Sequence, residues 1–286
     1  MAEFYLTLPS NTEPGNRTGQ FRVRLPEVVK LKGDWDVALA QIQYPKSWNN
    51  VTAENDPRTG FRKNEIYITI KDGMYTTFKI SIPPSHYDTV NDLLAVITNT
   101  TQDRVKELVI DELEEFATKH DEKREEDPKH VEILKKVPRS IYWDFDPISK
   151  HTTMKFNKDV ISSIRLSEHL QYVLGFEERD LHNWNTYKDM GKYPIDMRAG
   201  IDALYVYCDL VENQIIGNVR EPLLRILPVK GTYGEIIDQD FVARHYVPVL
   251  NKEFSTVEIS IKGDSNVLIP FAFGKVIVKL HFKKRK

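Results

Sequence analysis

The chain has 286 residues, of which 41% are hydrophobic and 29% are charged, a balance that allows a sizeable core and excludes global disorder. Its formal net charge of −2 excludes a field that would draw the whole molecule onto nucleic acid or anionic lipid. A single cysteine, Cys208, excludes an intrachain disulfide and a multi-cysteine metal site, which favours a reducing compartment.

The sequence predicts neither secretion nor a membrane anchor. Its first residues form too short an apolar stretch for a signal peptide, and no run of about 18 apolar residues could span a bilayer. We therefore expect a protein of the cytosol or nucleus that is not secreted. The sequons at Asn16, Asn50 and Asn99 are then chance matches.

Three early segments have the pattern of strands. Residues 20–25 alternate apolar and basic side chains, which predicts a strand with one solvated face, and Pro26 is expected to end it. Residues 35–44 are apolar at both alternate sets of positions, so both faces of this strand should be covered. Residues 65–70 and 75–82 are joined through an Asp-Gly pair and predict a β-hairpin.

A helical and charged excursion follows the hairpin. From Asp88 onward apolar residues recur at spacings of three and four, which predicts an amphipathic helix or helix pair capped by Asp88 or Thr89. Between residues 111 and 136 charged residues dominate and Pro128 breaks the pattern, which favours a solvated surface excursion. We predict that this insertion covers about residues 86–138.

Strand patterns return at residues 141–145 and 152–156, with Asp146 in the turn between them. A short helix should follow, with Ser167 as its N-cap and Gly175 as its C-terminal stop. Residues 177–200 include Trp184, Tyr187 and Tyr193 but have no period, which predicts a long surface loop. Such a loop could contact a neighbouring molecule or simply cover the sheet.

The last third of the chain is again rich in strand patterns. The final two patterns are the most regular, because apolar residues occupy every second position over most of their length. About a dozen strand candidates with one helical excursion predict an all-β sandwich in a single domain spanning residues 1–286. The last candidates are residues 201–209, 223–229, 241–249, 256–262 and 275–282, with an additional apolar segment at residues 267–273.

No catalytic motif stands out from the background. The tripeptide His86-Tyr87-Asp88 could form part of an iron site, with a distal ligand such as His151, His169 or His245. Eight histidines among 42 acidic residues produce about one such match by chance, so we expect no metal site.

Other polar residues also have structural explanations. The pair Asp144 and Asp146 could hold a divalent ion, but the turn before Pro147 explains the second aspartate. Cys208 lies in an apolar strand, as an inert buried thiol does. We predict no catalytic or cofactor-binding residues and a protein that is not an enzyme.

The C-terminus is the one local concentration of positive charge. It could contact nucleic acid or serve as a nuclear signal, and it could equally be the solubilising end of a hydrophobic strand. The tail is Lys283, Lys284, Arg285 and Lys286, and it extends a basic strand face that includes Lys275 and Lys279.

Several stretches together resemble the penton, or minor capsid, protein of Polinton/Maverick elements and their adintovirus and virophage relatives. Each alone is mostly ordinary strand sequence, but they occur in a shared order along the chain. They are residues 4–11 (FYLTLPSN), 33–48 (GDWDVALAQIQYPKSW), 166–176 (LSEHLQYVLGF), 254–261 (FSTVEISI) and 274–282 (GKVIVKLHF).

The resemblance implies a single jelly roll that assembles as a homopentamer at the five-fold vertices of an icosahedral virion. It implies a major capsid protein with a double jelly roll as a partner, packaged DNA as a possible one, and no cofactor. Assembly would take place in the host cytoplasm or nucleus. Two other hypotheses are a carbohydrate- or protein-binding β-sandwich module and, third, an iron-dependent oxygenase.

Overall fold

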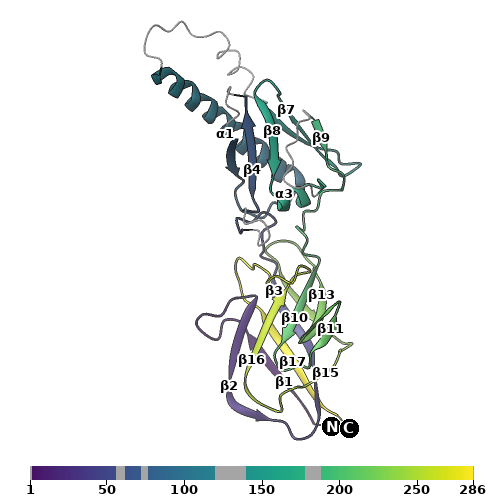
Figure 1. Cartoon of the computed structure of the whole chain (residues 1–286). Coiled ribbons are helices and arrows are strands. Elements are labelled where there is room, and N and C mark those ends of the chain that lie inside the picture. Colours follow the sequence, from purple (N-terminus) through teal and green to yellow (C-terminus); the bar gives the residue numbers. More distant parts are fainter. Residues whose placement is uncertain (1, 56–61, 72–76, 120–139, 178–187, 286) are drawn as a thin grey trace. The chain divides into compact units, whose positions relative to one another are not determined.

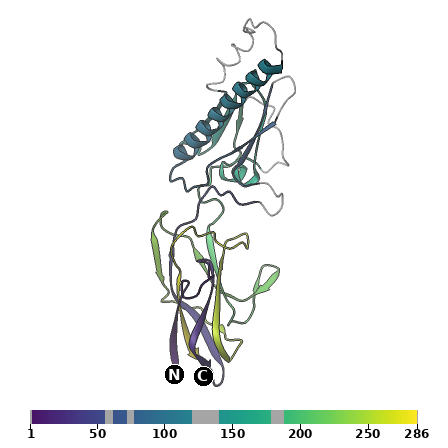
Figure 2. The ribbon, with the colours of Figure 1, turned by 90° about the vertical axis from the view of Figure 1, so that its left-hand side faces the viewer.

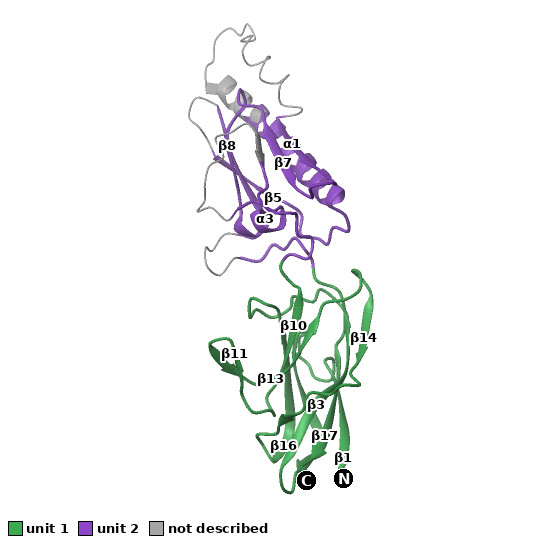
Figure 3. Cartoon of the chain, turned by 90° about the vertical axis from the view of Figure 1, so that its right-hand side faces the viewer, with its two compact units in different colours: residues 1–48, 200–286 green, residues 49–199 purple. Residues whose placement is uncertain are grey.

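A computed structural model describes residues 2–55, 62–71, 77–119, 140–177 and 188–285. The chain forms two compact units: unit 1 contains residues 1–48 and 200–286, and unit 2 contains residues 49–199 (Figure 3). Unit 1 is therefore built from both ends of the chain, and unit 2 is inserted between them. Among the described residues, no helix is long and apolar enough to span a membrane.

The first sheet of unit 1 joins the two ends of the chain (Figure 1). Its order is β1-β17-β3-β14, and β15 also pairs with β3. The ring of Phe4 stacks on that of Phe282 with centroids 4.7 Å apart, at a point where the first and last strands are in register. The strands are β1 (Glu3–Pro9), β3 (Trp35–Pro45), β14 (Ile236–Asp240), β15 (Val247–Pro248) and β17 (Ile277–Lys284).

The second sheet of unit 1 has the order β13-β10-β16-β2, and all its pairs are antiparallel. A separate two-stranded hairpin, β11–β12, lies beside it. The bounds are β2 (Gln20–Lys30), β10 (Ala203–Cys208), β11 (Gln214–Ile216), β12 (Val219–Glu221), β13 (Leu223–Pro228) and β16 (Glu253–Lys262).

The strand order of unit 1 is that of a jelly roll. In chain order the main strands are β1, β2, β3, β10, β13, β14, β16 and β17, and the chain changes sheet at every connection except β10 to β13. Two sheets with four main strands each, linked in this way, form the double-sheet jelly roll. The structure thus confirms the predicted all-β jelly-roll sandwich, and it places unit 2 in the connection between β3 and β10.

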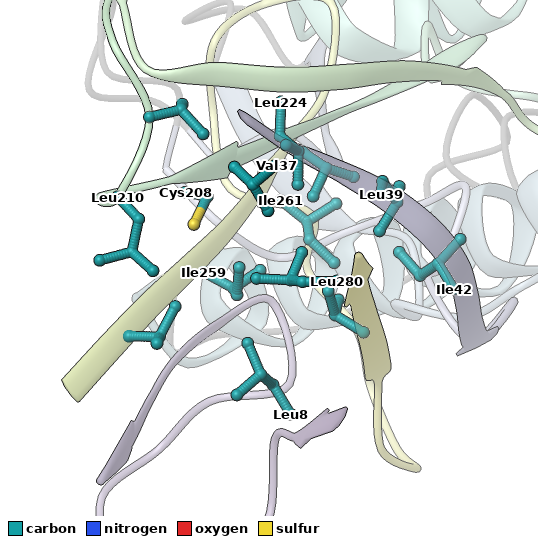
Figure 4. Packing of buried hydrophobic residues seen from close by; sticks show 14 of the residues in the cluster. Leu8, Val37, Leu39, Ile42, Cys208, Leu210, Leu224, Ile259, Ile261 and Leu280 are labelled. Atoms are coloured by element: carbon teal, nitrogen blue, oxygen red, sulfur yellow. The ribbon is translucent and has the colours of Figure 1, made fainter. Parts of the chain in front are cut away.

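Alternation along the strands builds the core between the two sheets (Figure 4). Leu39 and Leu280 come from the first sheet, Ile259 and Ile261 come from the second, and all four are fully buried. Leu8 of β1 lies in the same cluster, so both ends of the chain contribute to one core. Burial of each such side chain stabilises the fold by roughly 1.5–3 kcal/mol.

Within its described residues, unit 2 has its own hydrophobic core, formed by two three-stranded sheets and the helices α1 and α3. The sheet orders are β5-β4-β8 and β6-β7-β9, and the long helix α1 packs against β6. Figure 2 shows this long helix beside the strands of unit 2. The elements are β4 (Glu65–Ile70), β5 (Thr77–Ser81), α1 (Val90–Lys119), β6 (Ile141–Phe145), β7 (Thr152–Phe156), β8 (Ile161–Leu166), α3 (Glu168–Val173) and β9 (Lys188–Met190).

The predicted caps in unit 2 are confirmed. The hydroxyl of Thr89 accepts a hydrogen bond from the Asp92 backbone N–H at 3.2 Å, and the Asp92 carboxylate accepts one from the Thr89 N–H. This reciprocal pair caps α1. The Ser167 hydroxyl accepts from the backbone N–H of Leu170 and caps α3, while Gly175 follows that helix with φ +78°.

The structure divides the chain differently from the predicted single domain with an insertion at about residues 86–138. The inserted unit begins at residue 49 and ends at residue 199, so it includes the predicted hairpin and the strands after the helix. Strands in the two units have the same period of two, and periodicity alone does not tell which sheet a strand joins.

Two predicted strand limits are wrong. The chain is not a strand over residues 241–249: β14 ends at Asp240, and only Val247 and Pro248 form β15. Pro26 does not end the first predicted strand, because β2 continues to Lys30 at the edge of its sheet. Edge strands and bulges tolerate proline, and the register of β2 with β16 shifts nearby.

Some predictions fall on residues outside those that the structure describes. The pairing of β4 with β5 confirms the hairpin, but its turn residues Asp72 and Gly73 lie outside. The same holds for most of the charged segment after α1 and for Trp184 and Tyr187. The helix itself is confirmed as one continuous α1.

Candidate functional site

The candidate metal ligands His86 and Asp88 do not gather with a third ligand in the described part of the chain. The described residues contain no group of three or more His, Cys, Asp or Glu side chains that could hold a metal ion. Nε2 of His86 lies 3.7 Å from the carboxylate of Asp88, whose side chain is 81% exposed. None of His151, His169 and His245 joins these two in such a group within the described part of the chain.

Asp146 and Cys208 have structural roles, as predicted. The Asp146 carboxylate accepts hydrogen bonds from the Ile148 N–H at 2.9 Å and the Ser149 hydroxyl at 2.7 Å, which lowers its pKa and closes the turn. Cys208 is buried in unit 1, and burial raises the pKa of its thiol to about 12. A thiol with this pKa is almost entirely protonated at neutral pH and is a poor nucleophile.

The basic tail does not act as one free cluster of charge. Nη2 of Arg285 is 2.6 Å from the Asp36 carboxylate, and this contact raises the pKa of Arg285. Lys284 is exposed, and its backbone N–H donates to the carbonyl of Ala2. Lys286 lies outside the described residues. Lys283 points instead to the outer face of the first sheet, where other cations gather.

We call the group on that outer face the cationic–aromatic cluster. Alternation along β17 turns Val278, Leu280 and Phe282 into the core and leaves the residues between them on the opposite face. Strand β1 adds a ring to this face, and the connection between β14 and β15 adds two more side chains. The cluster consists of Tyr5, Arg244, Tyr246, Lys279, His281 and Lys283.

His281 organises the cluster from its centre. It is 2% exposed, and Nδ1 lies 2.8 Å from the hydroxyl of Tyr246 and 3.2 Å from Nη1 of Arg244. A guanidinium only donates hydrogen bonds, so Nδ1 accepts and the ring proton of the neutral form is on Nε2. Nε2 is 3.4 Å from the Glu3 carboxylate, in a geometry too poor for a hydrogen bond.

The surroundings of His281 favour its neutral form. Burial and the positive charge of Arg244 lower its pKa, and the carboxylate of Glu3 opposes them only in part. The ring of Tyr5 stacks on the imidazole with centroids 4.5 Å apart, and that of Tyr246 is tilted at 5.8 Å. His281 therefore acts as a fixed, uncharged support for the two tyrosines and the arginine.

Three cations lie over the tyrosine rings. Nζ of Lys279 is 5.2 Å and Cζ of Arg244 is 5.6 Å from the centroid of Tyr5, and Nζ of Lys283 is 5.5 Å from that of Tyr246. Within the described residues, no carboxylate lies within 4.0 Å of any of these three cationic groups. The cluster can therefore bind an anion without first breaking an ion pair.

Sequence reasoning found only part of this cluster. Lys279 and Lys283 belong to the basic strand face noted at the C-terminus. Tyr5, Arg244 and Tyr246 come from segments far away in the sequence and were missed. Only the register of β1 with β17 and of β15 with β3 brings them beside the lysines, and that register is set by the whole sheet.

Unit 2 contains a separate cleft of about 450 Å³. It is lined by the start of α1, by Phe145 and Lys150, and by residues 194–198. These last residues belong to the predicted surface loop at residues 177–200. That prediction is partly wrong, because β9 within the loop pairs with β7. The cleft mixes apolar and charged side chains, as small-ligand sites do.

No family model and no curated protein sequence matches the chain. Among solved structures, the chain is similar to the crystal structure of the mavirus penton protein. The TM-score is 0.47, the sequence identity is 12%, and the alignment covers 100% of each chain. It is also similar to a chain in the 3.5 Å cryo-EM structure of the Sputnik virophage, with a TM-score of 0.45 and 11% identity. The second alignment covers 99% of this chain and 97% of the other.

Proposed function

We propose that this chain is a structural minor capsid protein that forms homopentamers at the five-fold vertices of the icosahedral shell of a Polinton-like element or virus. It would contact copies of itself within the vertex and a major capsid protein with a double jelly roll around it. Its place would be the virion, after assembly in the host cytoplasm or nucleus. It would contribute interfaces and no catalysis.

The jelly-roll order of unit 1 is the observation that carries this proposal. Viral capsid domains are one of the protein classes built on this fold, although lectins and cupins share it. Four of the five penton-like stretches form or flank strands of this sandwich, in β1, β3, β16 and β17. The fifth, residues 166–176, ends β8 and includes α3 in unit 2.

The hairpin β11–β12, which we call the arm, is the surface that best fits contact with a second copy. Ile215 is 72% exposed and Val219 is 46% exposed, although both lie on strands. A two-stranded hairpin is only marginally stable without packing. Figure 3 shows β11 standing away from the two sheets. Val219 pairs with Ile216, so it points to the face opposite to that of Ile215, and a neighbouring copy would have to enclose both faces of the arm to cover these side chains.

The base of the arm is held firmly while its tip is exposed. Nζ of Lys262 is 3.4 Å from the Glu221 carboxylate and 4.7 Å from the ring centroid of Tyr207. Burial and the neighbouring Glu221 raise the pKa of Tyr207 to about 12. A fixed base and an apolar tip suit the heterologous contact that closes a ring of copies.

Self-association tests this proposal directly. Light scattering and electron microscopy of the purified protein, alone and mixed with a double-jelly-roll major capsid protein, should show five-membered rings. The double variant Ile215→Asp, Val219→Asp should remain folded and monomeric, because a desolvated carboxylate is costly in an apolar interface. Ile148→Asp is the control, because Ile148 is 91% exposed in unit 2 and the same change should leave the rings intact.

The alternative, a carbohydrate- or protein-binding module, is supported by the cleft in unit 2. Its walls include Phe145, Ile195 and Met197 beside Lys150 and Arg198, a mixture that a sugar or peptide could use. The binding module would be favoured over the capsid protein if the chain stayed monomeric at high concentration, both alone and with the major capsid protein, and bound a glycan on an array through this cleft.

A further inference from the structure

We propose that the outer face of β1 and β17 is a binding surface for single-stranded nucleic acid. The three cations of the cationic–aromatic cluster would hold phosphates, and its tyrosine rings would stack against bases. This inference concerns the surface of one chain and does not depend on the proposed homopentamer.

Among the described residues, the three cations of the cluster have no ion pair, unlike Lys30 and Lys252 of unit 1. Nζ of Lys30 is 3.0 Å from the Glu253 carboxylate, and Nζ of Lys252 is 2.9 Å from that of Asp34. The cluster cations have no such partner within 4.0 Å in the described part of the chain. The Nε of Arg244 is also buried without a hydrogen-bond partner. Such cations attract a polyanion most strongly.

The spacing of the cations follows the strand. Lys279 and Lys283 are four residues apart on β17, so they lie on the same face about 13 Å apart. His281 lies between them, with Tyr5 directly opposite on β1. Arg244 reaches the same ring from the connection that precedes β15. The result is a track of charges with an aromatic surface in its middle.

The exposed rings favour nucleic acid over an acidic peptide. Tyr5 is 45% exposed and Tyr246 is 37% exposed, although each has a cation beside it. Proteins that bind single strands combine a cationic groove with rings on which bases stack, and each stacked base contributes about 1–3 kcal/mol. An acidic peptide would need the charges but not the rings.

The face has a defined boundary. Glu3 lies at the edge of the cluster, with a side chain that is 55% exposed. Asp238 and Asp240 are exposed on β14, on the far side of β3. The two β14 carboxylates would repel a polyanion, so the bound strand should not cross the sheet, whereas Glu3, opposite Lys283 on β1, opposes binding at that end of the track.

The test measures binding of a labelled oligothymidylate to the full chain by fluorescence anisotropy at several salt concentrations. The affinity should fall as salt increases, and the log–log slope of Lys279→Gln, Lys283→Gln should be smaller than that of the wild type by about 0.7 for each lost phosphate contact. The control Lys30→Gln, Lys252→Gln removes the same charge from paired lysines and should keep the wild-type slope.

The stacking role of the tyrosine side chains is tested separately. Tyr5→Leu should weaken binding roughly 10-fold and leave the salt slope unchanged, whereas Tyr5→Phe should bind like the wild type. The inference is wrong if both double lysine variants change the slope equally or if the Tyr5 variants do not differ. Equal binding of polyglutamate would assign the face to an acidic protein segment. Light scattering of the same samples shows whether the chain forms homopentamers, independently of whether it binds the oligonucleotide.

Discussion

The buried side chain of His281 makes the stability of the protein depend on pH. Its pKa is lowered from the ordinary value of 6.5, mainly by burial and then by Arg244. Below that pH a histidine in the unfolded chain takes up a proton while native His281 does not. The unfolded state then binds more protons, so the free energy of unfolding falls as the pH falls below 6.5. This loss stops once the pH is below the native pKa.

We therefore expect His281→Gln to weaken the dependence of stability on pH. The groups that act on the ring are Glu3, Arg244, Lys283, Tyr5 and Tyr246, and the substitution keeps all of them. Thermal unfolding from neutral pH to about pH 5 would show a smaller loss of Tm for the variant than for the wild type. His245→Gln, which changes an exposed histidine, should retain the full loss; identical curves for all three proteins would refute this role.

At the scale of residues, sequence predicts what depends on near neighbours. The Ser167 cap and the Asp146 turn each require groups within three residues of one another, and the Gly175 stop requires only a residue that accepts a positive φ; all are present. The cationic–aromatic cluster requires a register across three strands, so Tyr5 and Arg244 gave no local indication of their neighbours.

Gly175 shows how one position ends an element. Its φ of +78° disfavours any other residue, and a Cβ there would overlap the carbonyl of Tyr193. Gly175→Ala should therefore destabilise the protein by more than the roughly 1–3 kcal/mol of the backbone strain alone. Gly234→Ala at φ +86° has no atom within 4 Å of the new Cβ and should show only the strain. Chemical denaturation measures both, and equal losses would exclude the overlap.

At the scale of elements, strands with a clear period are predicted well and connections are not. The predicted limits of β4, β6 and β7 match the structure, because each is a short alternating run between polar residues. Residues 241–249 also alternate in part, yet most of this segment crosses the outer face of a sheet as a connection. There Val242 is 97% exposed, and tertiary context overrides propensity.

At the scale of the whole molecule, the two separate cores should respond separately to substitutions. Leu280 belongs to the core of unit 1 and Leu93 to that of unit 2, and both are fully buried. Replacing either by alanine should cost about 2–5 kcal/mol. Hydrogen exchange with mass spectrometry should locate the loss of protection within the substituted unit. Equal losses in both units for either variant would mean that the chain unfolds as one cooperative body.

The number of compact units was the part of the fold least accessible to sequence. The penton-like stretches at the two ends of the chain form β1 and β17, which pair in one sheet. The inserted unit shares the composition and period of the sandwich around it, so no change of pattern marks residues 49 and 199. Only contacts between residues far apart in the chain separate one core from the other.

The two ends of the chain lie together, and this has a consequence for how the molecule can be rebuilt. The Lys284 N–H donates to the Ala2 carbonyl, and Lys284 pairs with Trp35 at the start of β3, whereas the inserted unit departs after the other end of that strand. In the described residues, no ladder of the sandwich crosses into residues 49–199. A short linker between the termini should therefore permit circular permutation, and residues 49–199 form a cassette that can be exchanged without altering a single strand pair.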